Sequence, residues 1–155
     1  MIGMPRPSRR KGAAHERDLA YRLFEAGFAV LRGPASGSKV KKLIYPDVVA
    51  IYKGKAFAFE VKAFSELRPI YLDAKRGERL LEFAERAGGE AYVAFKHIGS
   101  GEWRLVPLSA LRRTTSELVC DPKLLERATK LDDFVKRVKA EVEGTAITAF
   151  VHSKA

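Results

Sequence analysis

The sequence predicts a mixed α/β domain in which a central β-sheet is flanked by helices. Helical and strand-like spacings of apolar residues alternate along the chain, and each of two hairpin patterns is followed by a helical pattern. The length of 155 residues suits one domain. With 46% hydrophobic and 31% charged residues, the composition is typical of a globular protein rather than a disordered one.

The first elements are an arm, a helix, a strand and a loop. Residues 1–11 contain two prolines and four basic residues without apolar periodicity, and they predict a flexible basic arm. Apolar residues then recur at helical spacing from Gly12 to Ala26, and Gly27 is a natural stop for that helix. A short strand is expected at 28–31, followed by a Gly/Ser/Lys-rich loop at 33–45.

A hairpin is expected next, with strands at 47–52 and 56–62. Gly54-Lys55 fits a two-residue turn of type II′, because that turn favours glycine at its first position. This register places Asp47 opposite Lys62 on one face of the sheet. A three-residue turn would place the two residues on opposite faces, so the face depends on the turn.

The second half of the chain repeats the alternation. Residues 63–72 look irregular, and a helix capped by Asp73 should run to about Ala87, where two glycines end it. A second hairpin is expected at 91–96 and 102–106. The Asp-Pro pair at 121–122 begins a last helix, whose narrow apolar seam ends near Gly144.

Charge and cysteine content limit the class of function. The formal net charge is +10, and residues 1–42 carry ten Lys/Arg against three acids. This uneven excess favours a polyanion, above all nucleic acid, with an acidic protein or a membrane surface as alternatives. Cys120 is the single cysteine, which excludes an internal disulfide and a Cys/His zinc site, so any metal must be held by oxygen atoms.

Two features of the sequence bear on where the protein is located in the cell. No apolar run approaches the roughly 18 residues that a membrane helix needs. The basic N-terminus leads into no apolar segment, so we expect no secretory signal. The sequence therefore favours a cytoplasmic protein.

The most informative motif is Pro46-Asp47 followed by Glu60-Val61-Lys62. Alternation along a strand places Glu60 and Lys62 on one face of the sheet and the aromatic residues Phe57 and Phe59 on the other. With Asp47 on that face, two carboxylates and one ammonium converge. Such carboxylates repel unless a cation neutralises them, and Mg²⁺ suits a phosphate-ester substrate. The alternative is a surface hairpin carrying an ordinary Glu-x-Lys pair.

Further motifs surround this pair. They are Lys11-Gly12-x-x-x-Glu16-Arg17, Gly27-Phe28-x-Val30-x-Arg32, Ser36-Gly37, Asp47-Val48-Val49-Ala50 and Arg79-Leu80-x-x-Phe83. In this order and spacing, over residues 9–113, the chain resembles the PD-(D/E)xK nucleases and, more narrowly, the archaeal Holliday junction resolvases of the Hjc family. The resemblance implies a restriction-endonuclease-like fold with a central mixed sheet. It divides the chain into the arm at 1–11, a nuclease core at 12–113 and a C-terminal helical extension at 114–155, packed on the same domain.

The resemblance also implies an activity and a set of catalytic residues. The expected function is a metal-dependent endonuclease that resolves four-way DNA junctions by paired symmetric nicks. Asp47, Glu60 and Glu16 would hold one or two Mg²⁺ ions, with Mn²⁺ as an alternative, and no small-molecule cofactor is expected. Lys62 would be the catalytic lysine, and Ser36 matches a serine important for activity.

Several of these residues have simpler explanations. Glu16 could complement the positive end of its own helix. Ser36 could be an ordinary loop residue, and Arg17 and Arg32 could form solvent-exposed ion pairs. The loop after Ser36 is also longer than in the shortest family members, which leaves the distance from that serine to the metal site open.

Partners follow from the reaction. A four-way junction needs two symmetric nicks, so a homodimer with two-fold symmetry is expected. Leu80 and Phe83 are candidates for its interface, although burial of Phe83 in the core is an equal alternative. Expected contacts to DNA phosphates, in a nucleoid-associated protein, come from Arg9, Arg10, Lys11, Arg17, Arg32, Lys39, Lys41 and Lys42.

Two other functions remain open at this stage. A different PD-(D/E)xK nuclease would cut duplex or flap DNA. A DNA-binding scaffold of the same fold would bind without cutting, but such a scaffold usually loses its catalytic residues, and Asp47, Glu60 and Lys62 are all present.

Overall fold

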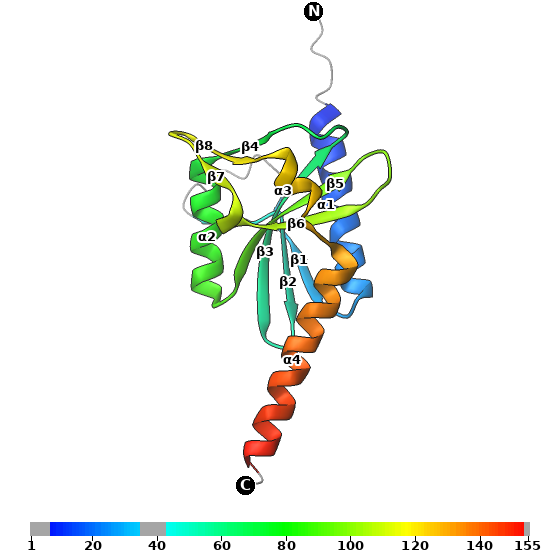
Figure 1. Cartoon of the computed structure of the whole chain (residues 1–155), viewed down its shortest axis with the longest axis vertical. Helices are drawn as coiled ribbons and strands as arrows, with labels where there is room; N and C mark the ends of the chain where they lie inside the picture. The colour runs from blue at the N-terminus through cyan, green and yellow to red at the C-terminus, as the bar shows by residue number, and fades with distance from the viewer. Residues whose placement is uncertain (1–6, 35–42, 154–155) are drawn as a thin grey trace, which may run out of the picture.

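A six-stranded mixed sheet forms the centre of the molecule (Figure 1), with strand order β1-β2-β3-β5-β6-β9. The computed structural model describes residues 7–34 and 43–153, with side chains for 12–34 and 43–144. Neighbouring strands are antiparallel except β3 and β5, which run parallel. The strands are β1 (Ala29–Arg32), β2 (Val48–Tyr52), β3 (Lys55–Phe64), β5 (Glu90–His97), β6 (Trp103–Pro107) and β9 (Thr129–Lys130).

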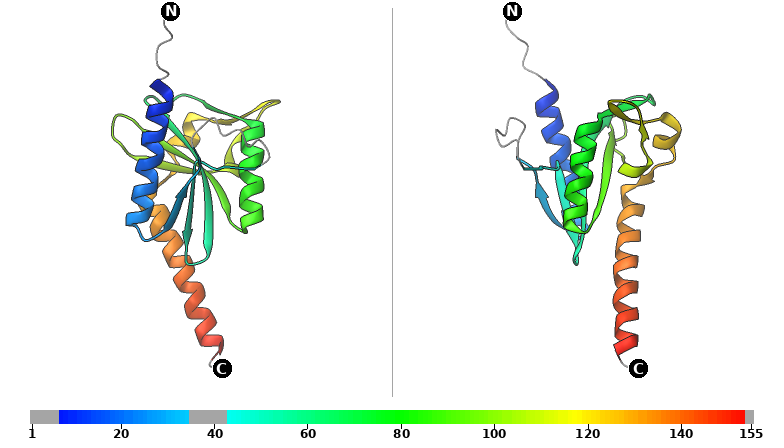
Figure 2. Two further views of the ribbon diagram at one scale, coloured as in Figure 1. Left: turned by 180° about the vertical axis from the view of Figure 1, so that it is seen from behind. Right: turned by 90° about the vertical axis from the view of Figure 1, so that its left-hand side faces the viewer.

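Helices and a second, smaller sheet surround this centre (Figures 1 and 2). The smaller sheet has the order β4-β8-β7. Its strands are β4 (Ile70–Asp73), β7 (Arg112–Arg113) and β8 (Glu117–Cys120). The helices are α1 (Pro7–Glu25), α2 (Ala74–Ala87), α3 (Pro122–Glu126) and α4 (Leu131–Ser153), with a short 3₁₀ turn η1 (Leu108–Ala110). The predicted mixed α/β class with a central sheet and flanking helices is confirmed.

Two hydrophobic cores lie on the two faces of the large sheet. On one face, Leu23 of α1 and Phe134 of α4 pack against Phe57 and Phe59 of β3. On the other face, Leu80 of α2 packs with Ala58, Val93 and their neighbours. Because successive strand residues point to opposite faces, Glu60 lies on the α2 side of β3. The helix α2 therefore covers the strand position that carries the candidate site.

The turn between β2 and β3 differs from the expected one. Lys53 and Gly54 both have positive φ, 46° and 90°, which is the two-residue type I′ turn. Tyr52 consequently pairs with Lys55, and Val48 pairs with Phe59. Asp47, directly before β2, thus lies opposite Glu60 rather than Lys62. The register shifts by two residues, so Asp47 keeps the predicted face of the sheet.

The first helix begins earlier than its apolar pattern indicated. It starts at Pro7 rather than Gly12, so the expected arm is helical over its last five residues, and residues 1–6 lie outside the described part. Proline is well suited to the first turn of a helix, where its missing N–H would have no partner. Arginine and lysine are good helix formers, which accounts for the added turn.

The predicted single helix over 121–143 is wrong. It is divided into α3 and α4 by β9, whose two residues extend the large sheet by pairing with β6. Asp121 precedes α3 but makes no capping hydrogen bond, because its carboxylate accepts two hydrogen bonds from Arg112. Beyond the expected end at Gly144, α4 continues to Ser153, and its last turns extend past the sheet (Figure 1). The region expected to be irregular, residues 63–72, contains the end of β3 and most of β4.

Other predicted elements are confirmed, including the second hairpin and the bounds of α2. Asp73 caps α2 by accepting a hydrogen bond from the Lys75 N–H, and Gly88 ends the helix in the left-handed conformation. Within the described residues, none of the helices has the length and apolar content needed to cross a bilayer.

Gly89 packs directly against the backbone of β3. A Cβ atom at this position would overlap the carbonyl oxygen of Ala56. We therefore expect Gly89→Ala to lower the free energy of unfolding by about 1–3 kcal/mol, because backbone cannot move aside as a flexible side chain can. Urea denaturation measures this change. The matched control is Gly12→Ala in α1, where a Cβ meets nothing within 4 Å and alanine should stabilise the helix. Equal effects of the two substitutions would contradict the packing described here.

Candidate active site

Asp47 and Glu60 face each other at one end of the β2–β3 hairpin. The Asp47 N–H donates to the carbonyl oxygen of Phe59 at 3.0 Å, which ties the residue before β2 to the neighbouring strand β3. The strand alternation directs the Glu60 side chain toward α2, where it is 4% exposed. A buried carboxylate and a second carboxylate from the neighbouring strand therefore meet under the first turn of a helix.

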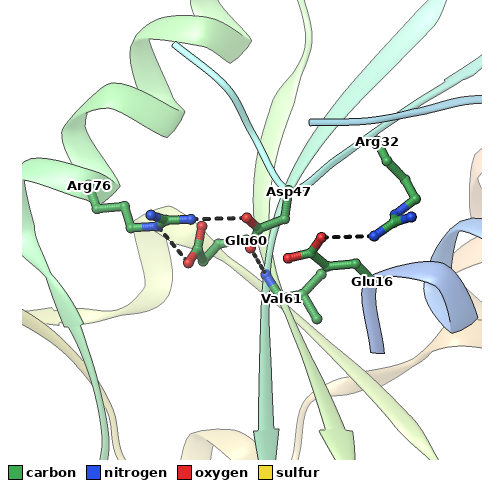
Figure 3. A network of polar contacts seen from close by, with 6 residues as sticks. All are labelled: Glu16, Arg32, Asp47, Glu60, Val61 and Arg76. Atoms are coloured by element: carbon green, nitrogen blue, oxygen red, sulfur yellow. Dashed lines mark hydrogen bonds and ion pairs between the residues drawn. The ribbon is translucent and has the colours of Figure 1, made fainter. Parts of the chain in front are cut away.

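Arg76 of α2 joins these two carboxylates (Figure 3). Its Nε donates to Glu60 Oε1 at 2.7 Å, and its Nη2 donates to Asp47 Oδ1 at 2.9 Å. The second oxygen of Asp47, Oδ2, accepts a hydrogen bond from the Val61 N–H at 2.8 Å. Both carboxylates are thus held in fixed orientations, and their oxygens converge on one positively charged group.

The surroundings change the protonation of this cluster. Burial, and after it the nearby charge of Asp47, raise the pKa of Glu60 from 4.5 to about 7, although Arg76 and Lys62 act in the opposite direction. For Arg76, burial acts to lower the pKa, but Glu60 and Asp47 outweigh it and the net pKa is raised. The carboxylate pair is therefore strained by its own negative charge and is stabilised by the guanidinium.

Glu16 approaches Asp47 from the other side of the sheet, on α1 (Figure 3). Burial and the charge of Asp47 raise the pKa of Glu16, which shows that the two carboxylates interact. Arg32 of β1 donates from Nη2 to Glu16 Oε2 at 3.3 Å. Arg32 thus forms an ion pair, the alternative to a DNA contact that the sequence left open. Because the partner is Glu16, Arg32 still lies beside the site.

The expected cluster of three carboxylates is not formed. Among the described residues, no three His, Cys, Asp or Glu side chains are grouped closely enough to hold a metal ion. Glu16 is carried by the helix on the opposite face of the sheet from α2, and its carboxylate is turned to Arg32. The geometry is therefore a site of two carboxylates with Glu16 beside it, and a role for Glu16 as a metal ligand stays a prediction.

Two carboxylates are enough to fit a divalent cation. Mg²⁺ is commonly bound by one or two carboxylates together with water and substrate phosphates. Asp47 and Glu60 offer hard oxygen donors that already converge on a positive charge. The donor set fits Mg²⁺ or Mn²⁺ and gives no reason to prefer one of them.

Lys62 lies two residues beyond Glu60 on the same face of β3 and is half-buried. Its charge lowers the pKa of Glu60, so the ammonium lies within electrostatic reach of that carboxylate. In the described part of the structure, no ion pair or hydrogen bond is recorded for its side chain. Lys62 therefore adds a positive charge on the face of the sheet that carries Glu60.

The remaining predicted residues fall into three groups. The side chains of Arg9, Arg10 and Lys11, and all of Ser36, Lys39, Lys41 and Lys42, lie outside the described part, so their roles stay predictions. Arg17 is exposed on α1, as a phosphate contact requires. Leu80 was expected at a dimer interface, but it is 3% exposed and packs in the core beneath α2, so that prediction is wrong. Phe83 is half-buried against the same core.

Arg76 was not recognised as a site residue from the sequence. A signal was present, because Lys75 and Arg76 occupy the first turn of a helix that has no acidic residue there. The positive end of the helix dipole disfavours cations in that turn, so two of them indicate a nearby anion. Only the folded structure identifies that anion as the Asp47–Glu60 pair.

Comparisons with known proteins identify the family of this chain. The family model described as archaeal Holliday junction resolvase (Hjc) matches residues 7–143. The crossover junction endodeoxyribonuclease Hjc of Sulfurisphaera tokodaii is 34% identical over 136 residues, which cover 87% of this chain and 92% of the relative. The protein of the same name from Archaeoglobus fulgidus is 42% identical over 111 residues, which cover 72% of this chain and 79% of the relative.

A solved structure is also similar. The structure of Archaeoglobus fulgidus Hjc, described as a Holliday junction resolvase from an archaeal hyperthermophile, superimposes with a TM-score of 0.69 and 35% sequence identity. The alignment covers 81% of this chain and 96% of that one. The resemblance inferred from the sequence motifs is confirmed. The chain belongs to the archaeal Holliday junction resolvase (Hjc) family.

Proposed function

We propose that this protein is an endonuclease that resolves four-way DNA junctions by hydrolysing phosphodiester bonds with the help of a divalent metal ion. The observation that carries the proposal is the convergence of Asp47 and Glu60 on one cationic group, with Lys62 on the same face. The relatives named crossover junction endodeoxyribonuclease support the reaction and its substrate. Mg²⁺ is the proposed ion, with Mn²⁺ as an alternative.

The residues of the site have distinct tasks. Asp47 and Glu60 would hold the cation, the first oriented by the Val61 N–H and the second by its burial. When bound, a divalent ion polarises the phosphodiester and lowers the pKa of a coordinated water. Lys62 points its positive charge to the same face and stabilises the negative charge that develops on the phosphate. Glu16 and Arg32 border the site on the α1 side.

A homodimer supplies the second nick. The helix α2 covers β3 and β5, and within residues 7–34 and 43–153 no helix covers the same face of β1 and β2 (Figure 2). Leu31 of β1 and Ile51 of β2 point to this face and are 68% and 37% exposed. We therefore assign the interface to this apolar face together with Phe83, in place of Leu80, because a second copy of the chain would shield it.

The remaining proposals concern DNA and location. Basic side chains on α1, in the 33–45 loop and on the N-terminal arm would contact phosphates, which position the junction without reading its sequence. Affinity should then decrease steeply with salt. Action on chromosomal DNA implies a cytoplasmic protein at the nucleoid, and the reaction needs no small-molecule cofactor.

Removing either carboxylate tests the catalytic assignment. We expect Asp47→Asn and Glu60→Gln to reduce junction cleavage by roughly 100-fold or more, because each variant loses a ligand of the ion that stabilises the transition state. Binding to the junction should remain near the level of the unmodified protein. Single-turnover cleavage and a gel-shift titration measure the two properties. Glu82→Gln, an exposed carboxylate on α2, is the control. Unchanged cleavage by either site variant would disprove the assignment.

Substrate choice separates this function from its two rivals. With Mg²⁺ present, we expect cleavage of a four-way junction at paired symmetric positions and little cleavage of linear duplex or flap DNA. The physical reason is that phosphate contacts from two copies match the geometry of the junction arms. Comparable cutting of duplex or flap DNA would indicate another nuclease of the same fold. Junction binding without cleavage would indicate a scaffold.

Glu60 predicts an unusual dependence of stability on pH in the metal-free protein. Its pKa is about 7 when folded and near 4.5 when unfolded, so the folded state binds more protons between these values. The free energy of unfolding should therefore decrease as pH rises from about 5 to about 7.5, by up to about 3 kcal/mol. Urea denaturation in EDTA measures the decrease, which should be smaller in Glu60→Gln. Parallel profiles for the two proteins would contradict the shifted pKa.

A further inference from the structure

Arg76 occupies the point on which the two proposed metal ligands converge. Its guanidinium donates hydrogen bonds to Glu60 Oε1 at 2.7 Å and to Asp47 Oδ1 at 2.9 Å, while Asp47 Oδ2 already accepts a hydrogen bond from the Val61 N–H. A Mg²⁺ ion at these oxygens would sit about 2.1 Å from them. An ion at that distance would lie against the guanidinium, and the two positive charges would repel strongly.

The guanidinium has a route away from the carboxylates. The side chain of Arg76 is 52% exposed, whereas that of Glu60 is 5% exposed. Arg76 can therefore rotate into water without disturbing the core, and Glu60 cannot. The first turn of α2 also disfavours a cation. The attraction of the two carboxylates is thus what holds Arg76 in place, and an ion that neutralised them would remove it.

We propose that Arg76 is the counter-ion of the metal-free site and is exchanged for the divalent ion when the metal binds. The inference rests on the proposed function, because it takes Asp47 and Glu60 as metal ligands. Arg76 is then a positioning residue that acts through those carboxylates. It keeps them together before the ion arrives, and it competes with the ion for their oxygens.

If Arg76 helped to bind the metal, its removal would weaken the affinity for Mn²⁺. Competition between Arg76 and the metal predicts the opposite. Arg76→Gln should bind Mn²⁺ more tightly than the unmodified chain, by about tenfold, because no charge-assisted hydrogen bonds have to break. Without metal, the same variant should have a lower melting temperature, since Glu60 and Asp47 lose their shared cation. The increase in melting temperature on adding Mn²⁺ should therefore be larger than in the unmodified chain.

Isothermal titration of the full chain with Mn²⁺, without DNA, measures the affinity directly. Lys75→Gln is the matched control, because it removes one positive charge from the same helix turn, where Lys75 contacts no carboxylate of the pair. Its Mn²⁺ affinity should change far less than that of Arg76→Gln. Arg76→Lys keeps the charge but loses the bidentate hydrogen bonding. Its affinity for Mn²⁺ should lie between those of the unmodified chain and Arg76→Gln.

A measurement on the unmodified chain guards against a variant that does not fold. The ¹⁵N–¹H signal of the Arg76 Nε should move toward the position of a solvent-exposed arginine as Mg²⁺ is added. An unchanged signal at saturating Mg²⁺, or Mn²⁺ affinity that is equal or weaker in Arg76→Gln, would overturn the exchange. Absence of Mn²⁺ binding that depends on Asp47 in the unmodified chain would instead overturn the proposed metal site itself.

Discussion

Electrostatic repulsion between Asp47 and Glu60 is the constraint on which this end of the molecule depends. The two carboxylates face each other across a pair of hydrogen-bonded strands, and one of them is almost completely buried. Burial alone would favour a neutral Glu60, as its raised pKa indicates. A guanidinium that donates to both residues stabilises the charged form. The position of α2 over β3 is therefore an electrostatic requirement of the site as well as a packing arrangement.

The rest of the fold supplies the geometry of this pair. The Lys53-Gly54 turn sets the register that brings Asp47 opposite Glu60. The alternation of strand residues directs both side chains away from the aromatic core and toward α2. On the other face, α1 and α4 pack against β3 and hold the strand in place. Each local feature is ordinary, and the site results from their combination.

The sequence predicted the parts that depend on local patterns. Alternation along β3 identified the face of Glu60, and Asp73 and Gly88 marked the ends of α2. It failed where distant segments decide. Pairing of β9 with β6 interrupts a periodic apolar seam, and Leu80 is buried because α2 packs on the sheet. The prediction of the β2–β3 turn was wrong because Lys53 adopts a positive φ. Lysine rarely adopts this conformation, so its presence in the sequence does not indicate it.

The site itself shows the same division between local and distant information. Strand alternation can place Asp47 and Glu60 together, but no pattern in the sequence says which helix supplies their cation. Arg76 lies sixteen residues beyond Glu60 and reaches it only because α2 folds back over β3. A cation held there before metal binding keeps the carboxylate oxygens converged, so little reorganisation is needed when an ion replaces it. The cost is a weaker affinity for the ion, and the gain is a pair of carboxylates that stays correctly oriented before the ion binds.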